Sequence, residues 1–362
     1  MDFGLSEEQV LLTATIKRFL DEQCPTTRVR AMMESDSGHD SGLWQGLVDL
    51  GVTGLSIPAA YGGSGLELLD IALVAEELGY AATPGPFLGS AMATVALAEG
   101  GDAAQRERWL PRIADGSAIV TVALGEDDSQ WEPARYTTRA KGGTLTGHKP
   151  FVPYAAVADA IIVAAVDDAG PGLWLAERGA PGMQITALKV VDMTRRVDGV
   201  RFTNTPATKL GGSADAVQRT LDAGCVLIAA DAYGGARRCL DMTVQYAMQR
   251  EQFGQVIGAF QAVKHQIANM ATELEPSLAL YWYAAHAFDR IRDKSERHAA
   301  LVKAHMSDVY DRIARDSTEL HGGIGFTWEF DLHLWFRRSV FDRSFLGEAA
   351  VHRARAADLA GW

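Results

Sequence analysis

The spacing of hydrophobic residues changes twice along the chain. In residues 1–116, and again in residues 213–362, apolar residues recur every three or four positions, as they do on one face of an α-helix. In residues 117–212 short apolar runs are separated by Gly, Asp and Pro, which is typical of β-strands joined by turns. The pattern predicts three domains with these bounds, in the order helical, β, helical. The fold class is therefore α+β with mostly α structure.

Local signals place several of the N-terminal helices. Ser6 followed by Gln9 has the spacing of a capping box, with an apolar stripe after it. A second helix begins near Leu43 and is expected to end at Gly51, because glycine readily takes the left-handed conformation that follows a helix. Residues 59–86 read as a Gly-rich loop, an amphipathic helix and a Pro/Gly break, and one more short helix follows before residue 117.

The middle and C-terminal parts divide in the same way. The expected strands lie in the runs 117–124, 143–152, 155–166, 172–177 and 197–207. The expected C-terminal helices are 214–248, about 258–291, 295–320 and 331–358.

Composition narrows the class of protein. The 362 residues are 48% hydrophobic and 22% charged, as in an ordinary globular protein. The net charge of -12 argues against nucleic acid or an anionic membrane as the main partner. The first residues lack the features of a signal peptide, and no apolar run reaches the ~18 residues of a membrane span. We therefore expect a cytoplasmic protein.

Cysteine and histidine spacing indicates no metal site. Cys24, Cys225 and Cys239 are far apart and form no CxxC pair, so neither a disulfide framework nor a zinc site is expected. The histidines at 265, 321 and 333 are not at ligand spacing and are interpreted as structural.

Two phrases near the C-terminus carry possible binding chemistry. In "REQFGQVIGAFQ" (250–261), Arg250 can give a forked contact to phosphate, Phe253 an aromatic face and Gln261 an amide. In "HGGIGF" (321–326), paired glycines let the backbone approach a phosphate closely. Taken singly, each phrase is more often an ordinary helix end or glycine turn.

Taken together and in order, these phrases resemble the acyl-CoA dehydrogenase family over nearly the whole chain. The other matching segments are "SEEQ", "PAAYGGSGL" (58–66), "EELG" (76–79) and "QRERWLPRIADG" (105–116). The resemblance implies an N-terminal helical domain, a middle β-barrel-like domain and a C-terminal four-helix bundle that bind FAD. It also implies αβ-dehydrogenation of an acyl-CoA, in which a Glu takes the α-proton and flavin N5 takes a hydride from the β-carbon.

In this family the cofactor is shared across a subunit interface, so its two halves can be compared separately. The adenine and pyrophosphate half matches well, at Arg250, Phe253, Gln261, Gly322, Gly323 and Gly325. One departure is Glu319, where the family usually has Gln.

The half that holds the flavin ring matches poorly. The family's Thr-Glu-Pro segment falls on residues 123–133, with Gly125 in place of the Thr. The second contact strand, usually Trp-Ile-Thr or Trp-Ile-Ser, keeps an aromatic residue at Phe151. Pro153 replaces its hydroxyl residue and has no N–H.

The catalytic base is also missing from both positions where the family carries it. One position falls on Leu346, and the earlier one that a minority uses falls on Gly224. Asp231 lies two helical turns beyond Gly224, and Glu348 two residues beyond Leu346, so both acids are candidates to replace the base. A capping or solvated role is the other interpretation of each.

This asymmetry resembles the degenerate subunit of the heteromeric α2β2 acyl-CoA dehydrogenases of actinobacteria. The resemblance implies a second, related subunit that supplies the base, an acyl-CoA substrate, possibly the CoA thioester of a steroid side chain, and an electron-transfer flavoprotein. Three alternatives stay open: a self-sufficient homo-oligomer that uses Asp231 or Glu348, a purely structural or regulatory homologue without FAD, and an FAD mono-oxygenase or nitroalkane-oxidase-like chemistry on the same fold.

Overall fold

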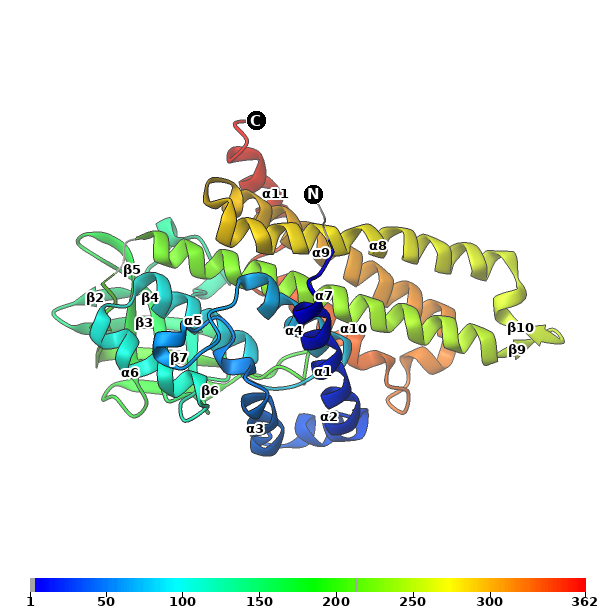
Figure 1. Cartoon of the computed structure of the whole chain (residues 1–362), viewed down its shortest axis with the longest axis horizontal. Helices are drawn as coiled ribbons and strands as arrows, with labels where there is room; N and C mark the ends of the chain where they lie inside the picture. Colours follow the sequence, from blue (N-terminus) through cyan, green and yellow to red (C-terminus); the bar gives the residue numbers. More distant parts are fainter. Residues whose placement is uncertain (1–3, 212–213) are drawn as a thin grey trace.

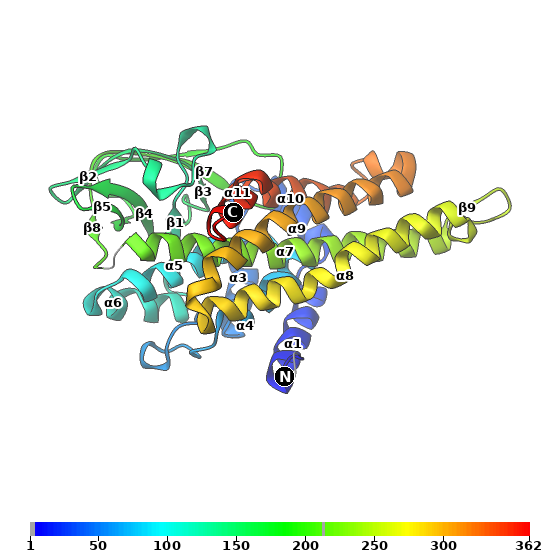
Figure 2. The same cartoon turned by 90° about the horizontal axis from the view of Figure 1, so that it is seen from above.

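The computed structural model describes residues 4–211 and 214–362, and it has the predicted order of helical, β and helical parts. The molecule is elongated, with the sheet at one end and a long helical hairpin reaching out at the other (Figures 1 and 2). The α+β fold class with mostly α structure is confirmed. The first helical part consists of α1 (Glu7–Gln23), α2 (Thr26–Glu34), α3 (Ser41–Asp49), α4 (Leu68–Tyr80), α5 (Phe87–Gly100) and α6 (Ala103–Ala114).

The capping box at Ser6 and the helix end at Gly51, both predicted for the N-terminal helices, are confirmed. The backbone N–H of Gln9 donates to the Ser6 hydroxyl at 3.2 Å, and the Ser6 N–H donates back to the Gln9 amide oxygen at 3.1 Å. Gly51 has a φ of 77° directly after the last residues of α3. Helices α2 and α5 were not predicted. Because α5 is buried around most of its circumference, its sequence has no alternation of polar and apolar positions.

Close backbone contact joins the N-terminal helices to the C-terminal bundle. A Cβ on Gly79 of α4 would lie 2.1 Å from the carbonyl oxygen of Asp231, and one on Gly234 would lie 1.8 Å from that of Glu76. The two helices can therefore cross at this distance only because glycine has no side chain. Helix α4 is buried on nearly all sides, so the expectation of an amphipathic helix here was wrong.

The β-domain is one curled sheet with the strand order β6-β7-β3-β2-β4-β5-β8, and β1 pairs in parallel with β4. Both faces of β4 are buried: Ile161 and Val163 belong to the small core inside the sheet, and Ile162 to the main core beside the helices. Strands β2, β6 and β8 were not predicted. The strands are β1 (Val120–Ala123), β2 (Arg139–Lys141), β3 (Thr144–Pro153), β4 (Ala160–Asp167), β5 (Gly170–Glu177), β6 (Met183–Ala187), β7 (Val197–Pro206) and β8 (Thr208–Lys209).

The C-terminal part is a bundle in which α7, α8 and α9 run side by side and α10 and α11 pack on α9. The predicted single helix over 331–358 is wrong, because the chain breaks at residues 345–348. Its elements are α7 (Ala214–Gln249), the hairpin β9 (Glu251–Gln252) and β10 (Gln255–Val256), α8 (Gln261–Arg290), α9 (Arg292–His321), α10 (Leu332–Ser344) and α11 (Ala349–Asp358).

The exact domain bounds stay predictions. The boundary predicted between residues 212 and 213 lies outside the described residues. The three cysteines are buried and unpaired. Among the described residues, no helix combines the length and apolarity that crossing a membrane requires.

Candidate functional site

The two positions at which the resemblance places a catalytic glutamate meet at one point. A Cβ on Gly224 of α7 would lie 2.6 Å from Cδ1 of Leu346, in the turn between α10 and α11. The same Cβ would lie 2.5 Å from the terminal methyl group of Met92 on α5. Leu346 and Met92 are both buried. This point is therefore filled with apolar atoms, and a larger side chain at position 224 could enter only if its neighbours moved.

A buried lysine and histidine hold the turn that carries Leu346. Lys303 of α9 donates from Nζ to the carbonyl oxygens of Asp342, Arg343 and Gly347, at 2.8, 3.1 and 3.0 Å. The His352 ring contacts the Leu346 carbonyl oxygen through Nε2 at 3.0 Å. These contacts satisfy carbonyls that the end of α10 leaves open, and they support a backbone in which Leu346 has a φ of 64°.

Glu348 occupies the first position outside α11. Its backbone carbonyl begins the helix, but its side chain makes no capping hydrogen bond and is exposed. The residue lines a pocket of about 630 Å³ between the turn and residues 126–137. Of the two candidate acids, Glu348 is the one with space in front of it.

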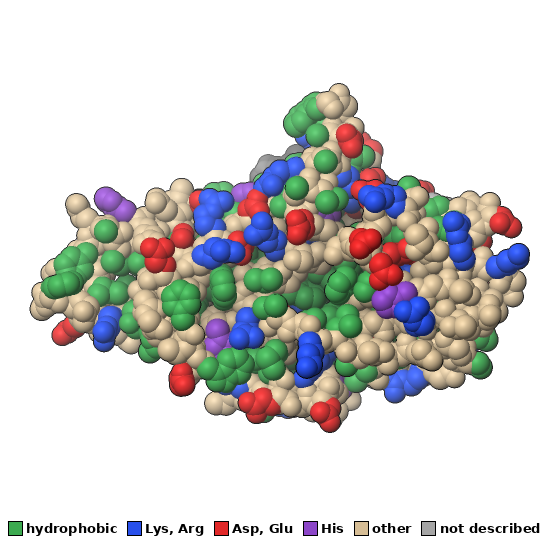
Figure 3. Space-filling view, turned by 180° about the vertical axis from the view of Figure 1, so that it is seen from behind, with side chains coloured by type: hydrophobic (Ala, Val, Ile, Leu, Met, Phe, Trp, Pro, Cys, Tyr) green, Lys and Arg blue, Asp and Glu red, His purple; other side chains and the backbone are tan. Residues whose placement is uncertain are grey.

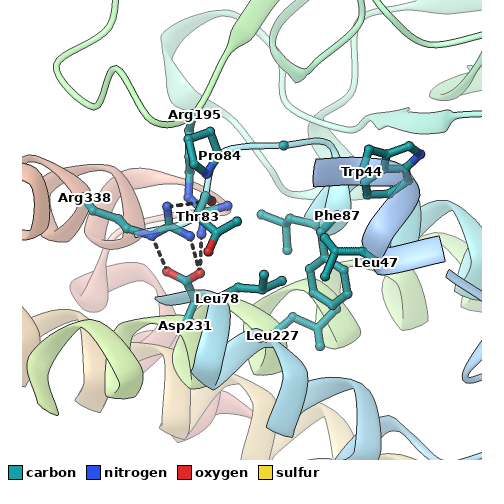
Figure 4. A pocket seen from close by; sticks show the side chains of 13 residues that line it. Trp44, Leu47, Leu78, Thr83, Pro84, Phe87, Arg195, Leu227, Asp231 and Arg338 are labelled. Carbon is teal, nitrogen blue, oxygen red and sulfur yellow. Dashed lines mark hydrogen bonds and ion pairs between the residues drawn. The ribbon is translucent and has the colours of Figure 1, made fainter. Parts of the chain in front are cut away.

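Asp231 lies in a buried cluster of charges at the junction of the three domains. Arg338 of α10 binds both of its carboxylate oxygens, at 2.8 and 2.6 Å, and Arg195 of the β-domain binds one of them at 2.7 Å (Figure 4). Arg338 also donates to the Thr83 carbonyl oxygen and to the Thr194 hydroxyl. The cluster thus ties the segment after α4, helices α7 and α10 and the loop before β7 to one another.

The electrostatics of this cluster favour an ionised Asp231. Burial alone would raise the pKa of Asp231, but the charges of Arg195 and Arg338 outweigh it and hold the pKa below its usual range. Burial and the nearby Asp231 charge raise the pKa of Asp342. The adjoining pocket has a volume of only about 20 Å³, which is room for about one water molecule. The site beside Asp231 has no space for an acyl chain.

By itself the run "MTRRVDGVRF" (193–202) predicts that Arg195, Arg196 and Arg201 lie mostly on a solvated face, and for Arg195 this prediction is wrong. Its side chain is buried against Asp231, and Arg196 donates to the carbonyl oxygens of Met33 and Ser35. Arg201 alone of the three is exposed as expected. Sequence spacing could not reveal this, because the partners come from other domains.

At the flavin-ring positions, Gly125 lies against the ring of Trp131. A Cβ on Gly125 would be 2.9 Å from the indole. The other side of the indole meets Phe345 edge to face, with a centroid distance of 5.1 Å. A threonine at position 125 would therefore collide with Trp131.

The second contact strand ends beside an apolar pocket of about 290 Å³. Phe151 lines it with Val191, Phe341 and Phe345. The carbonyl of Pro153 accepts a hydrogen bond from the Thr121 hydroxyl at 2.7 Å, and this residue offers no donor. The residues present therefore do not fit the polar edge of a flavin ring.

The predicted adenine-side residues come together at the far end of the bundle, where α7 passes through the hairpin into α8. Phe253 is 93% exposed at the hairpin tip, with a φ of 53°. Arg250 and Gln261 are exposed at the two ends of the hairpin, and among the described residues neither side chain makes a hydrogen bond or ion pair. An aromatic face, a cation and an amide are thus free for a ligand.

The glycine turn follows α9 at the same end of the bundle. Gly322 has a φ of 64°, and no atom lies within 4 Å of a Cβ built on Gly322 or Gly323, so this backbone is open. Gly325 packs closely, because its Cβ would lie 2.7 Å from the Thr318 carbonyl oxygen. Glu319 is exposed nearby. These residues fit a pyrophosphate and adenine.

The hairpin of the adenine side and the sheet of the ring side lie at opposite ends of the molecule. The β9–β10 hairpin reaches away from the bundle, and the sheet lies at the other end (Figures 1 and 2). From behind, hydrophobic side chains are visible at the hairpin end and across the middle of the face (Figure 3). The glycine turn is not separated in this way, because the pocket that Gly325 lines and the pocket that Phe151 lines share Val191 and Val340.

Sequence reasoning missed Lys303, His352 and Trp131. A signal existed for Lys303, which lies at helical spacing from the buried residues Ala299, Met306 and Tyr310. The roles of His352 and Trp131 depend on how the chain folds back on itself to bring them against Leu346 and Gly125, each six residues away. Within residues 4–211 and 214–362, no group of His, Cys, Asp and Glu has the geometry of a metal site.

Comparison with known proteins gives a consistent result. Residues 6–117 match the family description "Acyl-CoA dehydrogenase, N-terminal domain", and residues 212–360 match "Acyl-CoA dehydrogenase, C-terminal domain". The acyl-CoA dehydrogenase IpdE2 of Mycolicibacterium smegmatis is 33% identical, over 95% of this chain and 96% of its own length.

Solved structures agree over the whole chain. The Tcur3481-Tcur3483 steroid ACAD has a TM-score of 0.92 and 31% identity, and the match covers 98% of each chain. The ChsE4-ChsE5 complex of Mycobacterium tuberculosis has a TM-score of 0.91 and 27% identity, covering 100% of this chain and 99% of the other. Both are named as assemblies of two different chains.

Proposed function

This chain belongs to the acyl-CoA dehydrogenase family, and we propose that it is the subunit of a heteromeric enzyme that holds the adenine side of FAD without supplying the base. The enzyme would catalyse αβ-dehydrogenation of an acyl-CoA thioester. The observation that carries the proposal is the contact between Gly224 and Leu346, because both family positions for the base are apolar there and packed together.

The adenine side fits the cofactor. Arg250 would pair with the pyrophosphate as a fixed cation, and the open backbone at Gly322 and Gly323 would donate to it. Phe253 and Gln261 would provide stacking and an amide for the adenosine part. When bound there, FAD would supply the hydride acceptor, and an electron-transfer flavoprotein is the electron acceptor that we propose for the enzyme.

The ring side does not fit, and this is why a partner is needed. Gly125 offers no hydroxyl, Pro153 has no N–H, and the space beside Asp231 is about 20 Å³. A second acyl-CoA dehydrogenase-like subunit would provide the ring site, the acyl slot and the glutamate. The position of the hairpin supports this, since it extends away from the chain's own β-domain.

The substrate class is proposed from relatives alone. One similar structure is named as a steroid ACAD, and CoA thioesters of steroid side chains are therefore the first substrates to test. Gly224 and Leu346 do not identify the acyl group, because they pack against each other and against Met92.

The test is the flavin content of the chain expressed alone and together with the acyl-CoA dehydrogenase-like chain of the neighbouring reading frame. We expect a colourless chain alone, and a pair that elutes together with less than one FAD per subunit. Arg250→Ala and Phe253→Ala should lower the FAD content of the pair without lowering its melting temperature. Arg201→Ala, an exposed arginine of the β-domain, is the matched control.

One alternative keeps a specific observation in its favour. Glu348 lines the pocket of about 630 Å³, so a self-sufficient enzyme would most simply use this carboxylate. Three results together would establish that alternative. The chain alone would bind one FAD per subunit, an acyl-CoA would bleach this FAD, and Glu348→Gln would lose the dehydrogenase activity. A pair that contains no FAD would instead favour the structural homologue.

A further inference from the structure

We propose that Trp131 closes the flavin-ring site of this chain, so that the chain excludes an isoalloxazine ring by its own side chain. The inference deepens the proposed function. Only its interpretation, that a partner subunit holds the flavin ring instead, rests on that function. It identifies one residue that decides which of two related subunits holds the ring.

The indole fills the space between the β-domain and the turn after α10. It covers Gly125 at the end of β1, and a Cβ on that glycine would lie 2.9 Å from the six-membered ring. On its other side it meets Phe345 edge to face, and a Cβ on Gly347 would lie 3.9 Å from its Cδ1 atom. Trp131 is only 8% exposed. Gly125 is a position at which the family contacts the flavin ring, and Phe345 and Gly347 flank Leu346, one of the family's positions for the base.

Trp131 is also the wall between two cavities. The pocket of about 630 Å³ in front of Glu348 and the apolar pocket of about 290 Å³ beside Phe151 share three lining residues, which are Ser129, Trp131 and Ser344. A fused three-ring system needs one continuous flat slot. Here Trp131, with Ser129 and Ser344, stands between the two cavities.

The loop that carries Trp131 is anchored rather than loose. At its start, the Glu126 carboxylate accepts hydrogen bonds from Lys149 at 2.9 Å and from the Thr138 N–H at 2.9 Å. The Glu126 N–H donates to the Gln130 carbonyl at 2.8 Å, and the Tyr136 hydroxyl donates to the Trp131 carbonyl at 3.4 Å. These contacts hold the loop folded back over Gly125.

The closed conformation has local costs. Asp128 and Ser129 have φ values of 58° and 55°, which residues other than glycine adopt rarely. Among the described residues, none accepts a hydrogen bond from the buried indole N–H of Trp131. The packing of the ring against Gly125 and Phe345 must outweigh both costs, which fits a residue whose role is to fill this space.

The test uses the chain alone and lumiflavin, which has the isoalloxazine ring but no adenine or pyrophosphate. Equilibrium dialysis and flavin-fluorescence quenching would measure its binding to the wild type, Trp131→Ser and Trp362→Ser. Trp362 is 85% exposed, so its substitution is the matched control. We expect saturable binding to Trp131→Ser that is at least about tenfold tighter than to the other two. Adding Gly125→Thr to Trp131→Ser should tighten it further, because it restores a hydroxyl.

A second measurement does not depend on flavin. Gly125→Thr should lower the melting temperature of the wild type, because its side chain collides with the indole. It should lower that of Trp131→Ser much less. If Trp131→Ser does not fold, Trp131→Leu takes its place in both experiments.

Two results would overturn the inference. The first is a folded Trp131 variant that binds lumiflavin no more tightly than the wild type. The second is an equal cost of Gly125→Thr in both backgrounds. Neither result depends on the partner subunit, so a failure to form a flavin-containing pair would count against the proposed function alone.

Discussion

Gly224 and Leu346 face each other so closely that a Cβ on the glycine would lie 2.6 Å from Cδ1 of the leucine. They come from α7 and from the turn after α10, 122 positions apart by residue number (346 minus 224). A carboxylate at either position would enter the same dry space, which explains how one family can carry its base at either place. In this chain that space holds Leu346 and Met92, and the consequences can be measured.

A carboxylate introduced at Leu346 should be strongly destabilising. Leu346→Glu would bury a charge without a partner, and we expect a loss of more than about 3 kcal/mol in the free energy of unfolding at pH 7. Because burial raises the pKa of such an acid, the loss relative to the wild type should shrink at pH 5. Urea unfolding at both pH values measures it. Leu346→Met is the control, and equal costs of the two variants would contradict the packed arrangement.

The contact with Met92 predicts a coupling between two substitutions. Gly224→Ala overfills the site and should cost about 1–3 kcal/mol. In a Met92→Ala background the same substitution should cost less, since the methyl group that it meets at 2.5 Å is gone and only the contact with Leu346 at 2.6 Å remains. A double-mutant cycle by urea unfolding gives the coupling energy. Additive costs would show that the two residues do not compete for the same space.

Asp231 is expected to stabilise the domain junction. Asp231→Asn leaves Arg195 and Arg338 without their buried counter-charge and should cost about 3–5 kcal/mol. The matched control is Asp167→Asn, which removes a solvent-exposed ion pair with Lys209 and should cost less than about 1 kcal/mol. If Asp231 were the base, the variant would instead lose the activity of the purified pair while keeping its unfolding free energy.

His352 should make stability fall in mildly acidic solution. Burial, together with the charge of Lys303, lowers its pKa to about 3. The folded state therefore binds this proton less readily than the unfolded state, whose histidine has a pKa of ~6.5. The contribution of neutral His352 to the free energy of unfolding is complete above pH ~6.5. It is lost as the pH falls towards 3, at up to about 1.4 kcal/mol per pH unit.

The corresponding measurement compares urea unfolding of the wild type and His352→Gln at pH 7 and pH 5. Glutamine can still donate to the Leu346 carbonyl but does not titrate. The wild type should lose about 2 kcal/mol more than the variant over this interval. The same loss in both proteins would mean that His352 is not held in its neutral form.

How far each feature could be predicted depended on whether its cause is local. The Ser6–Gln9 capping box and the helix end at Gly51 are set by neighbouring residues, and both were predicted correctly. Helix α5 has apolar side chains on most sides because other helices and the sheet surround it, so it shows no helical period. The break at residues 345–348 depends on Lys303 and His352, which reach it from two other helices.

The sequence by itself determined the order of helical and β parts, the family resemblance and the uneven match to the two halves of an FAD site. Those features follow from hydrophobic period and from residue types at fixed spacing, which are properties of the chain before it folds. Only the tertiary structure decided that Gly224 and Leu346 meet, that Asp231 is paired with two arginines and that Trp131 covers Gly125. The first two are contacts between residues far apart in the chain, and the third depends on how residues 125–131 fold back on themselves. Burial and close packing exist only after the elements have come together, so no local pattern encodes them.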